Sequence, residues 1–185
     1  MRATPRPLAS GTYPGPTGAT ALVTAHTNWR KTLDVLTLLK DDHARIKKML
    51  EEGETTTERG EKTRTELLHR LKTTLVAHEA MEEEVLYPAL KAHPQAEELT
   101  LEAYEEHHVV DLILEELEMT PVTDEQWGAK FTVARENIEH HIEEEEGEMF
   151  KDIREIFSAA ERESMGARMA EIQALGRQVI GAEGP

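Results

Sequence analysis

Two short stretches of the chain place a histidine four residues before a glutamate. His78 precedes Glu82, and His141 precedes Glu145. Residues four apart on an α-helix lie on the same face, roughly 6 Å apart along the helix axis. An imidazole and a carboxylate in this arrangement can bind one divalent metal ion between them. The spacing therefore predicts cation binding as the chemistry of both stretches.

A further histidine precedes each of these pairs at nearly the same distance. His43 lies 35 residues before His78, and His107 lies 34 residues before His141. Two acidic residues come directly before each of these additional histidines. Such a repeat indicates a helix hairpin that occurs twice in the chain and is related to its copy by a pseudo-two-fold axis.

All six of these residues fall on apolar stripes with helical spacing, so we expect their side chains to face a core. The stripe of the second helical run consists of Leu71, Leu75, His78, Glu82, Val85 and Ala89. Neighbouring residues on a helix point about 100° apart. His140 and His108, which are adjacent to stripe histidines, are therefore expected on the surface.

The stripes predict four helices over residues 29–52, 58–91, 96–118 and 124–157, with a fifth helix after residue 158. The pairs Thr123 with Gln126 and Ser158 with Glu161 have the spacing of capping boxes at the last two helix starts. Apolar clusters with a period of two are absent, so no sheet is expected. The predicted fold is an all-α, antiparallel four-helix bundle with an internal two-fold helix-hairpin repeat, plus a C-terminal fifth helix.

The distribution of proline and glycine predicts three parts of the chain. Residues 1–30 are rich in both and contain no acidic residue, which predicts a disordered N-terminal tail. Residues 31–157 form the predicted metal-binding bundle, and residues 158–185 form the C-terminal helix and tail.

Carboxylates on core-facing stripes need positive charge nearby, because burying an unpaired carboxylate is costly. No lysine or arginine falls on these stripes. Two divalent ions would supply the charge, with each glutamate bridging both ions at the separation of about 3.5–4 Å that is usual in two-metal sites. The predicted metal ligands are His43, His78, Glu82, His107, His141 and Glu145.

The composition excludes several other classes of protein. The chain of 185 residues has no cysteine, which excludes disulfides, iron–sulfur clusters and cysteine nucleophiles. Its net charge of −16 disfavours binding to nucleic acid or anionic membranes. No apolar run approaches the roughly 20 residues of a membrane span, and no signal peptide is visible. We expect a cytoplasmic protein without nucleic-acid or membrane partners, and no protein partner can be named.

These motifs resemble those of the hemerythrin-like, or HHE cation-binding, domain family. The resemblance covers about residues 33–157 and rests on residues 38–43, 78–88, 106–117 and 139–150. It implies a four-helix bundle around a non-haem di-iron centre, in which carboxylates and an oxo or hydroxo group bridge two iron ions. Manganese and zinc are the alternatives, because imidazole and carboxylate ligands suit all three metals.

One position departs from the oxygen-carrying members of that family. Animal hemerythrins have an additional histidine one turn after the ligand of the third helix, where this chain has Asp111. The set of four histidines and two glutamates is more similar to bacterial di-iron proteins linked to nitrosative stress and to the repair of iron centres. The resemblance therefore implies a protein that binds or senses oxygen, nitric oxide or peroxide in a stress response.

Two alternatives use the same centre differently. One is an oxidoreductase with catalase-like activity, and the other donates iron or repairs iron centres under nitrosative and oxidative stress. No further acid–base pair stands out near the stripes, which favours binding over catalysis. We therefore predict no catalytic residue, and small diatomic molecules or peroxide are the expected ligands.

Overall fold

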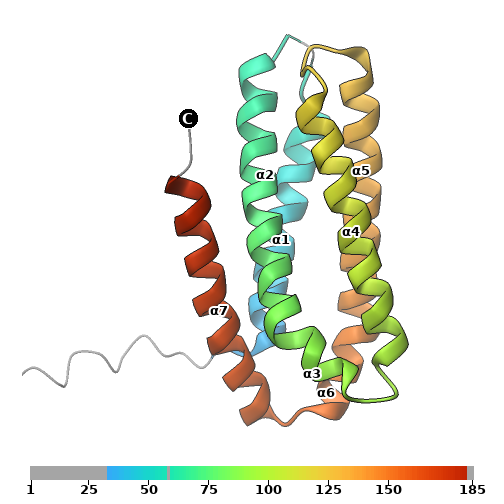
Figure 1. The fold of residues 1–185 in the computed structure, drawn as a ribbon, viewed down its shortest axis with the longest axis vertical. Helices are drawn as coiled ribbons and strands as arrows, with labels where there is room; N and C mark the ends of the chain where they lie inside the picture. The colour runs from blue at the N-terminus through green and yellow to red at the C-terminus, as the bar shows by residue number, and fades with distance from the viewer. Residues whose placement is uncertain (1–32, 58, 183–185) are drawn as a thin grey trace, which may run out of the picture. The chain divides into compact units, whose positions relative to one another are not determined.

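A computed structural model describes residues 33–57 and 59–182 of the chain (Figure 1). All regular structure in these residues is helical, and no strand occurs among them. The elements, in chain order, are α1 (Val35–Glu54), α2 (Glu61–Met81), the π-helical turn η1 (Glu82–Leu86), α3 (Tyr87–Lys91), α4 (Glu97–Met119), α5 (Glu125–Glu144), a second π-helical turn η2 (Glu145–Met149), α6 (Phe150–Ile156) and α7 (Ala159–Ala182).

The predicted antiparallel four-helix bundle and its C-terminal fifth helix are both confirmed. Helices α1 and α2 pack together, α4 packs on α5, and α1 also contacts α5. The π-helical turns join α2 to α3 and α5 to α6, so each of these pairs continues one long helix of the bundle. Helix α7 lies along α2 and α1 on the outside of the first hairpin (Figure 1).

Helix starts follow the local side-chain chemistry, which corrects the expected first helix at residues 33 and 34 and the expected cap of α5. Helix α1 begins at Val35 because the Asp34 carboxylate accepts a hydrogen bond from the Leu36 N–H at 2.9 Å, so residues 33 and 34 are not helical. The cap of α5 is Asp124 and not Thr123. Ser158 and Glu161 do form the expected capping box before α7, with Ser158 N–H donating to Glu161 at 2.8 Å.

The core consists of two apolar clusters, and the predicted metal ligands lie between them along each helix. One cluster includes Leu39, Met81 and Ala103, and the other includes Ile46 and Leu75. The stripe histidines interrupt this apolar interior between the two clusters. Charged groups at this level are therefore shielded from water on both sides along the helix axes.

Both hairpins contain a π-helical turn that starts at the stripe glutamate. The Tyr87 N–H bonds to the Glu82 carbonyl, and the Phe150 N–H bonds to the Glu145 carbonyl. A π-helical turn contains one residue more than an α-helical turn. After η1 the positions that face the core are therefore shifted by one residue, and Leu90 is buried in place of the expected Ala89. Pro88 cannot be the common cause, because η2 has the same turn without a proline. Such turns often occur at functional sites, and these two coincide with the predicted ligands.

Some expectations concern residues outside the described part of the chain. The N-terminal tail expected over residues 1–30 and the helical start expected at Trp29 both lie there. The division of the chain at residues 30 and 157 therefore stays a prediction. Within the described residues, no helix has the length and apolar character needed to cross a membrane.

The seating of α7 against the start of α1 gives a testable prediction. A Cβ atom added at Gly166 would overlap the backbone carbonyl oxygen of Leu33. We expect Gly166→Ala to lower the free energy of unfolding by about 1–3 kcal/mol, as overpacking usually does. Urea denaturation of the full chain measures this change.

The control is Gly128→Ala in α5, where an added Cβ meets nothing within 4 Å. This change should leave stability equal or raise it by up to about 1 kcal/mol, because alanine favours helix. Equal stability of Gly166→Ala and the unsubstituted chain would show that α7 does not pack as described.

Candidate metal centre

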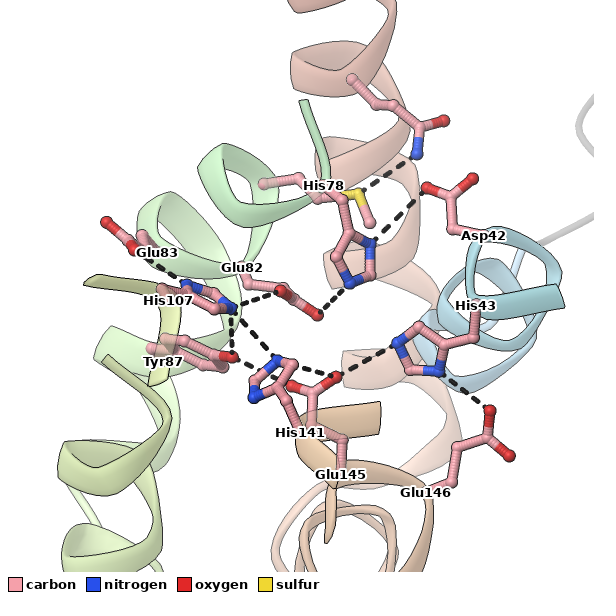
Figure 2. Close-up of polar contacts among 12 residues, drawn as sticks. Asp42, His43, His78, Glu82, Glu83, Tyr87, His107, His141, Glu145 and Glu146 are labelled. Atoms are coloured by element: carbon pink, nitrogen blue, oxygen red, sulfur yellow. Dashed lines mark hydrogen bonds and ion pairs between the residues drawn. The ribbon is translucent and has the colours of Figure 1, made fainter. Parts of the chain in front are cut away.

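The structure brings all six predicted ligands together in the interior. Each is at most 5% exposed, so the expected burial is confirmed. His43 comes from α1, His78 from α2 and His107 from α4, while His141 comes from α5. Glu82 and Glu145 are the first residues of η1 and η2. Figure 2 shows that these side chains point toward one another from four sides.

The Nε2 atoms of the four imidazoles face the two carboxylates. His43 Nε2 lies 3.2 Å from Glu145 Oε2, and His141 Nε2 lies 3.7 Å from the same oxygen. His78 Nε2 lies 3.3 Å from Glu82 Oε1, while His107 Nε2 lies 3.5 Å from Glu82 Oε2. Each glutamate therefore lies between a histidine of one hairpin and a histidine of the other.

The donor atoms form two groups of a size suited to metal ions. One consists of His43, His78, Glu82 and Glu145, and the other of Glu82, His107 and His141. Within each group all donor atoms lie within 4.8 Å of one another. Glu82 belongs to both groups, so its carboxylate could contact a cation held in either of them.

The outward-facing Nδ1 atom of each imidazole meets a second carboxylate. His43 Nδ1 donates to Glu146 at 3.0 Å, His107 Nδ1 to Glu83 at 2.9 Å, and His141 Nδ1 to Glu106 at 2.7 Å. His78 Nδ1 faces Asp42 at 3.8 Å. A proton held on Nδ1 leaves the Nε2 lone pair pointing inward, as a metal-binding histidine requires.

These outer carboxylates follow the internal repeat, and their role was not predicted. The acid directly before the first histidine of each hairpin, Asp42 or Glu106, faces the second histidine of the same hairpin. The acid directly after each stripe glutamate, Glu83 or Glu146, bonds the first histidine of the other hairpin. The signal that could have revealed them was the acidic neighbour that recurs at equivalent positions of both hairpins.

Several buried polar atoms of the centre lack a hydrogen-bond partner among the described residues. They are His43 Nε2, His78 Nε2, both carboxylate oxygens of Glu82 and Glu145 Oε2. In addition, His107 Nε2 and His141 Nε2 are 3.2 Å apart, although both rings donate through Nδ1. Two facing lone pairs repel unless a proton or a cation lies between them. The donor set therefore fits divalent cations coordinated by nitrogen and oxygen.

The pKa shifts describe how protons balance the charges in the absence of metal. Burial raises the pKa of Glu82 well above its ordinary value, and the charge of Glu145 adds to this. Burial also acts to raise the pKa of Glu145, but His141 and His43 outweigh it and lower the pKa. Burial opposes charge on His43 and His141, yet Glu145 raises both pKa values. Cations would displace these protons, so their affinity should increase with pH.

A cavity of about 10 Å³ lies beside the candidate metal centre. It has room for roughly one water molecule. Three of the predicted ligands line it, together with Glu79 and apolar side chains. The remaining lining residues are Ile46, Leu75, Val110, Ile138 and Ile142. Burial raises the pKa of Glu79 to about 7, so this carboxyl group carries a proton in part of the molecules at neutral pH.

Tyr87 is a second protonated group at the centre that the stripes did not single out. Its hydroxyl donates to Glu145 Oε1 at 3.0 Å and lies 3.2 Å from His107 Nε2. Burial raises its pKa well above the ordinary value, so the phenol stays protonated. Tyr87 therefore holds the Oε1 atom of Glu145 in a fixed orientation. Its inward position follows the shift of register at η1.

Comparison with known proteins gives a family and a structural relative. Residues 34–153 match the family model described as hemerythrin HHE cation binding domain. The chain belongs to this family. A crystal structure of a hemerythrin HHE cation binding domain-containing protein from Mycobacterium kansasii has a TM-score of 0.70 and 27% identity. That similarity covers 79% of this chain and 88% of the other. A comparison with curated proteins found no match to this sequence.

Family membership agrees with the resemblance seen in the sequence. The hemerythrin HHE domain binds cations, and this chain has buried histidine and glutamate groups that could hold them. The assignment of the six side chains as ligands stays a prediction. It can be tested by comparing variants of buried histidines with variants of the exposed histidines next to them.

We expect His141→Ala and His107→Ala each to lose tightly bound metal, because each removes a buried donor. His140→Ala and His108→Ala should keep it, because both of these histidines are exposed. Metal analysis of the four purified variants after dialysis measures the difference. The exposed pair should also stay within about 0.5 kcal/mol of the original stability. If His140→Ala emptied the centre and His141→Ala did not, the ligand assignment would be off by one residue.

Proposed function

We propose that this protein binds two iron ions through His43, His78, Glu82, His107, His141 and Glu145, and uses them to bind a small oxidant. The observation that supports this proposal most directly is the set of buried donor atoms without hydrogen-bond partners. The oxidant is oxygen, nitric oxide or peroxide, and the outcome of its binding would be carriage or sensing.

The ligand chemistry narrows the metal to three candidates, and the family resemblance favours iron among them. Imidazole nitrogen and carboxylate oxygen, without thiolate, suit iron, manganese and zinc. Iron is chosen from the family's resemblance to known di-iron proteins. A pair of ferrous ions would supply the electrons and an open coordination position that a diatomic oxidant requires.

The cavity beside His78, His107 and His141 supports a small ligand. Its volume of about 10 Å³ leaves room for a molecule of the size of water or oxygen. Five of its lining side chains are apolar, and the others are three imidazoles and the Glu79 carboxyl group. The outer carboxylates hold the imidazole rings in orientation, since rotation of a ring would break its Nδ1–H hydrogen bond.

A second candidate function is catalase-like breakdown of peroxide, and Glu79 is the observation that favours it. Its carboxyl group lines the same cavity as three predicted ligands. Burial raises its pKa to about 7, near the value that suits a general acid or base at neutral pH. A proton held on the Glu79 carboxyl is thus available to a ligand in the cavity.

Addition of oxygen to the protein loaded anaerobically with two equivalents of ferrous ion tests the leading proposal. We expect an absorption band from ligand-to-iron charge transfer that appears with oxygen and disappears when oxygen is removed. Uptake of about one oxygen molecule per chain should accompany it. If the loaded protein showed neither band nor uptake with oxygen, nitric oxide or peroxide, the proposal would be wrong.

The same preparation separates binding from catalysis. With hydrogen peroxide, the second candidate requires many turnovers per chain, accompanied by release of oxygen. Glu79→Gln should then reduce turnover by about 100-fold or more, the usual contribution of an acid–base group. The matched control is Glu84→Gln, because Glu84 is exposed on η1. Equal turnover in both variants would remove Glu79 from the reaction.

A further inference from the structure

A third group of possible metal donors lies outside the buried centre. It consists of Glu106 on α4 with His140 and Glu144 on α5. His140 Nε2 lies 3.4 Å from Glu144 Oε1 and 3.6 Å from Glu106 Oε1. The His140 side chain is 62% exposed, whereas those of Glu144 and Glu106 are 33% and 19% exposed. The group is therefore reachable from solvent and still partly held in place by its surroundings.

The spacing of these atoms matches a metal-binding arrangement. Metal–ligand bonds of about 2.0–2.2 Å place neighbouring ligands of a tetrahedral ion roughly 3.4 Å apart. His140 and Glu144 also have the four-residue spacing of the two buried pairs, one residue earlier on the same helix. Glu144 Oε2 is buried and has no hydrogen-bond partner among the described residues. Three ligands leave positions for water, as in an exchangeable site.

Glu106 connects this group directly to the buried centre. Its Oε1 atom faces His140, while its Oε2 atom accepts the 2.7 Å hydrogen bond from His141 Nδ1. One carboxylate thus contacts an exposed histidine with one oxygen and a predicted ligand of the centre with the other. A cation held by Glu106 and His140 would lie directly outside the layer formed by His141.

The internal repeat shows that the group occurs on only one side of the bundle. Alignment of His78 with His141 places Ala77 at the position of His140, and Met81 at that of Glu144. Helix α7 covers both of these residues. Gly176 packs closely against Ala77, since a Cβ atom added to the glycine would lie 3.3 Å from the Ala77 Cβ. The Gln173 Nε2 atom donates a hydrogen bond to the Met81 sulfur at 3.6 Å. The covered side has apolar residues where the uncovered side has metal donors.

We propose that Glu106, His140 and Glu144 form a second, exchangeable site for divalent cations, through which metal reaches the buried centre. The site itself is independent of the proposed function, whereas the transfer of metal inward rests on it. The surplus of acidic residues in the chain attracts cations to the surface, and His140 gives this group a selectivity that carboxylates alone lack.

Zinc binding to the full-length protein tests the site. Equilibrium dialysis against Zn²⁺ should give one fewer bound ion per chain in His140→Ala and in Glu144→Gln than in the unsubstituted protein. His108→Ala is the matched control, because it removes another exposed histidine and leaves all three donors in place. It should bind as many ions as the unsubstituted protein. Equal stoichiometry in His140→Ala and His108→Ala would overturn the site.

The rate of iron loading tests the role of the site. Ferrous ion is added anaerobically to metal-free protein, a chelator stops the reaction at intervals, and the chelator-resistant iron is counted. His140→Ala and Glu144→Gln should reach the same final content as His108→Ala, but at least ten-fold more slowly. Equal loading rates would overturn the role in transfer. If no variant retained chelator-resistant iron, the proposed di-iron centre would fail, whereas the zinc measurement would still decide the exposed site.

Discussion

The burial of two carboxylates in one apolar interior is the constraint on which the structure of this protein depends. Glu82 and Glu145 are at most 1% exposed, and each meets histidines of both hairpins. No lysine or arginine among the described residues forms an ion pair with either. Their negative charges must be balanced by protons or cations, because burial of an uncompensated charge costs several kcal/mol. Raised pKa values favour protons on His43, His141 and the Glu82 carboxyl group, and divalent cations would displace these protons.

The remaining features keep this polar layer in place. Outer carboxylates fix the imidazole rings, and they do so twice, in positions related by the internal repeat. The π-helical turns at Glu82 and Glu145 let each helix present a glutamate inward and still bury an aromatic residue below it. Helix α7 covers one hairpin and leaves the group around His140 uncovered on the other.

Much of this arrangement was predictable from the spacing of residues, because helical periodicity reports directly which side chains face a core. It separated His141 from His140 and placed Glu82 and Glu145 inside. The π-helical turns were not predicted, since the helical stripes were laid out with regular α-helical spacing and η1 and η2 depart from it. The hydrogen bonds of Glu83 and Glu146 were missed for a different reason. Both look like surface acids on their own helix, and only the neighbouring helix reveals their partners.

The thermal stability of the full chain with and without metal tests the central claim most directly. Cations that bind the folded centre and not the unfolded chain stabilise the fold by about 2.7 kcal/mol per site at 100 times Kd. For a chain of this size that corresponds to an increase in Tm of roughly 5 °C or more. We predict that ferrous ion, added anaerobically at pH 7 to metal-free protein, raises Tm by this amount, whereas Mg²⁺ at the same concentration does not. Identical melting of the metal-free and iron-treated protein would contradict the account.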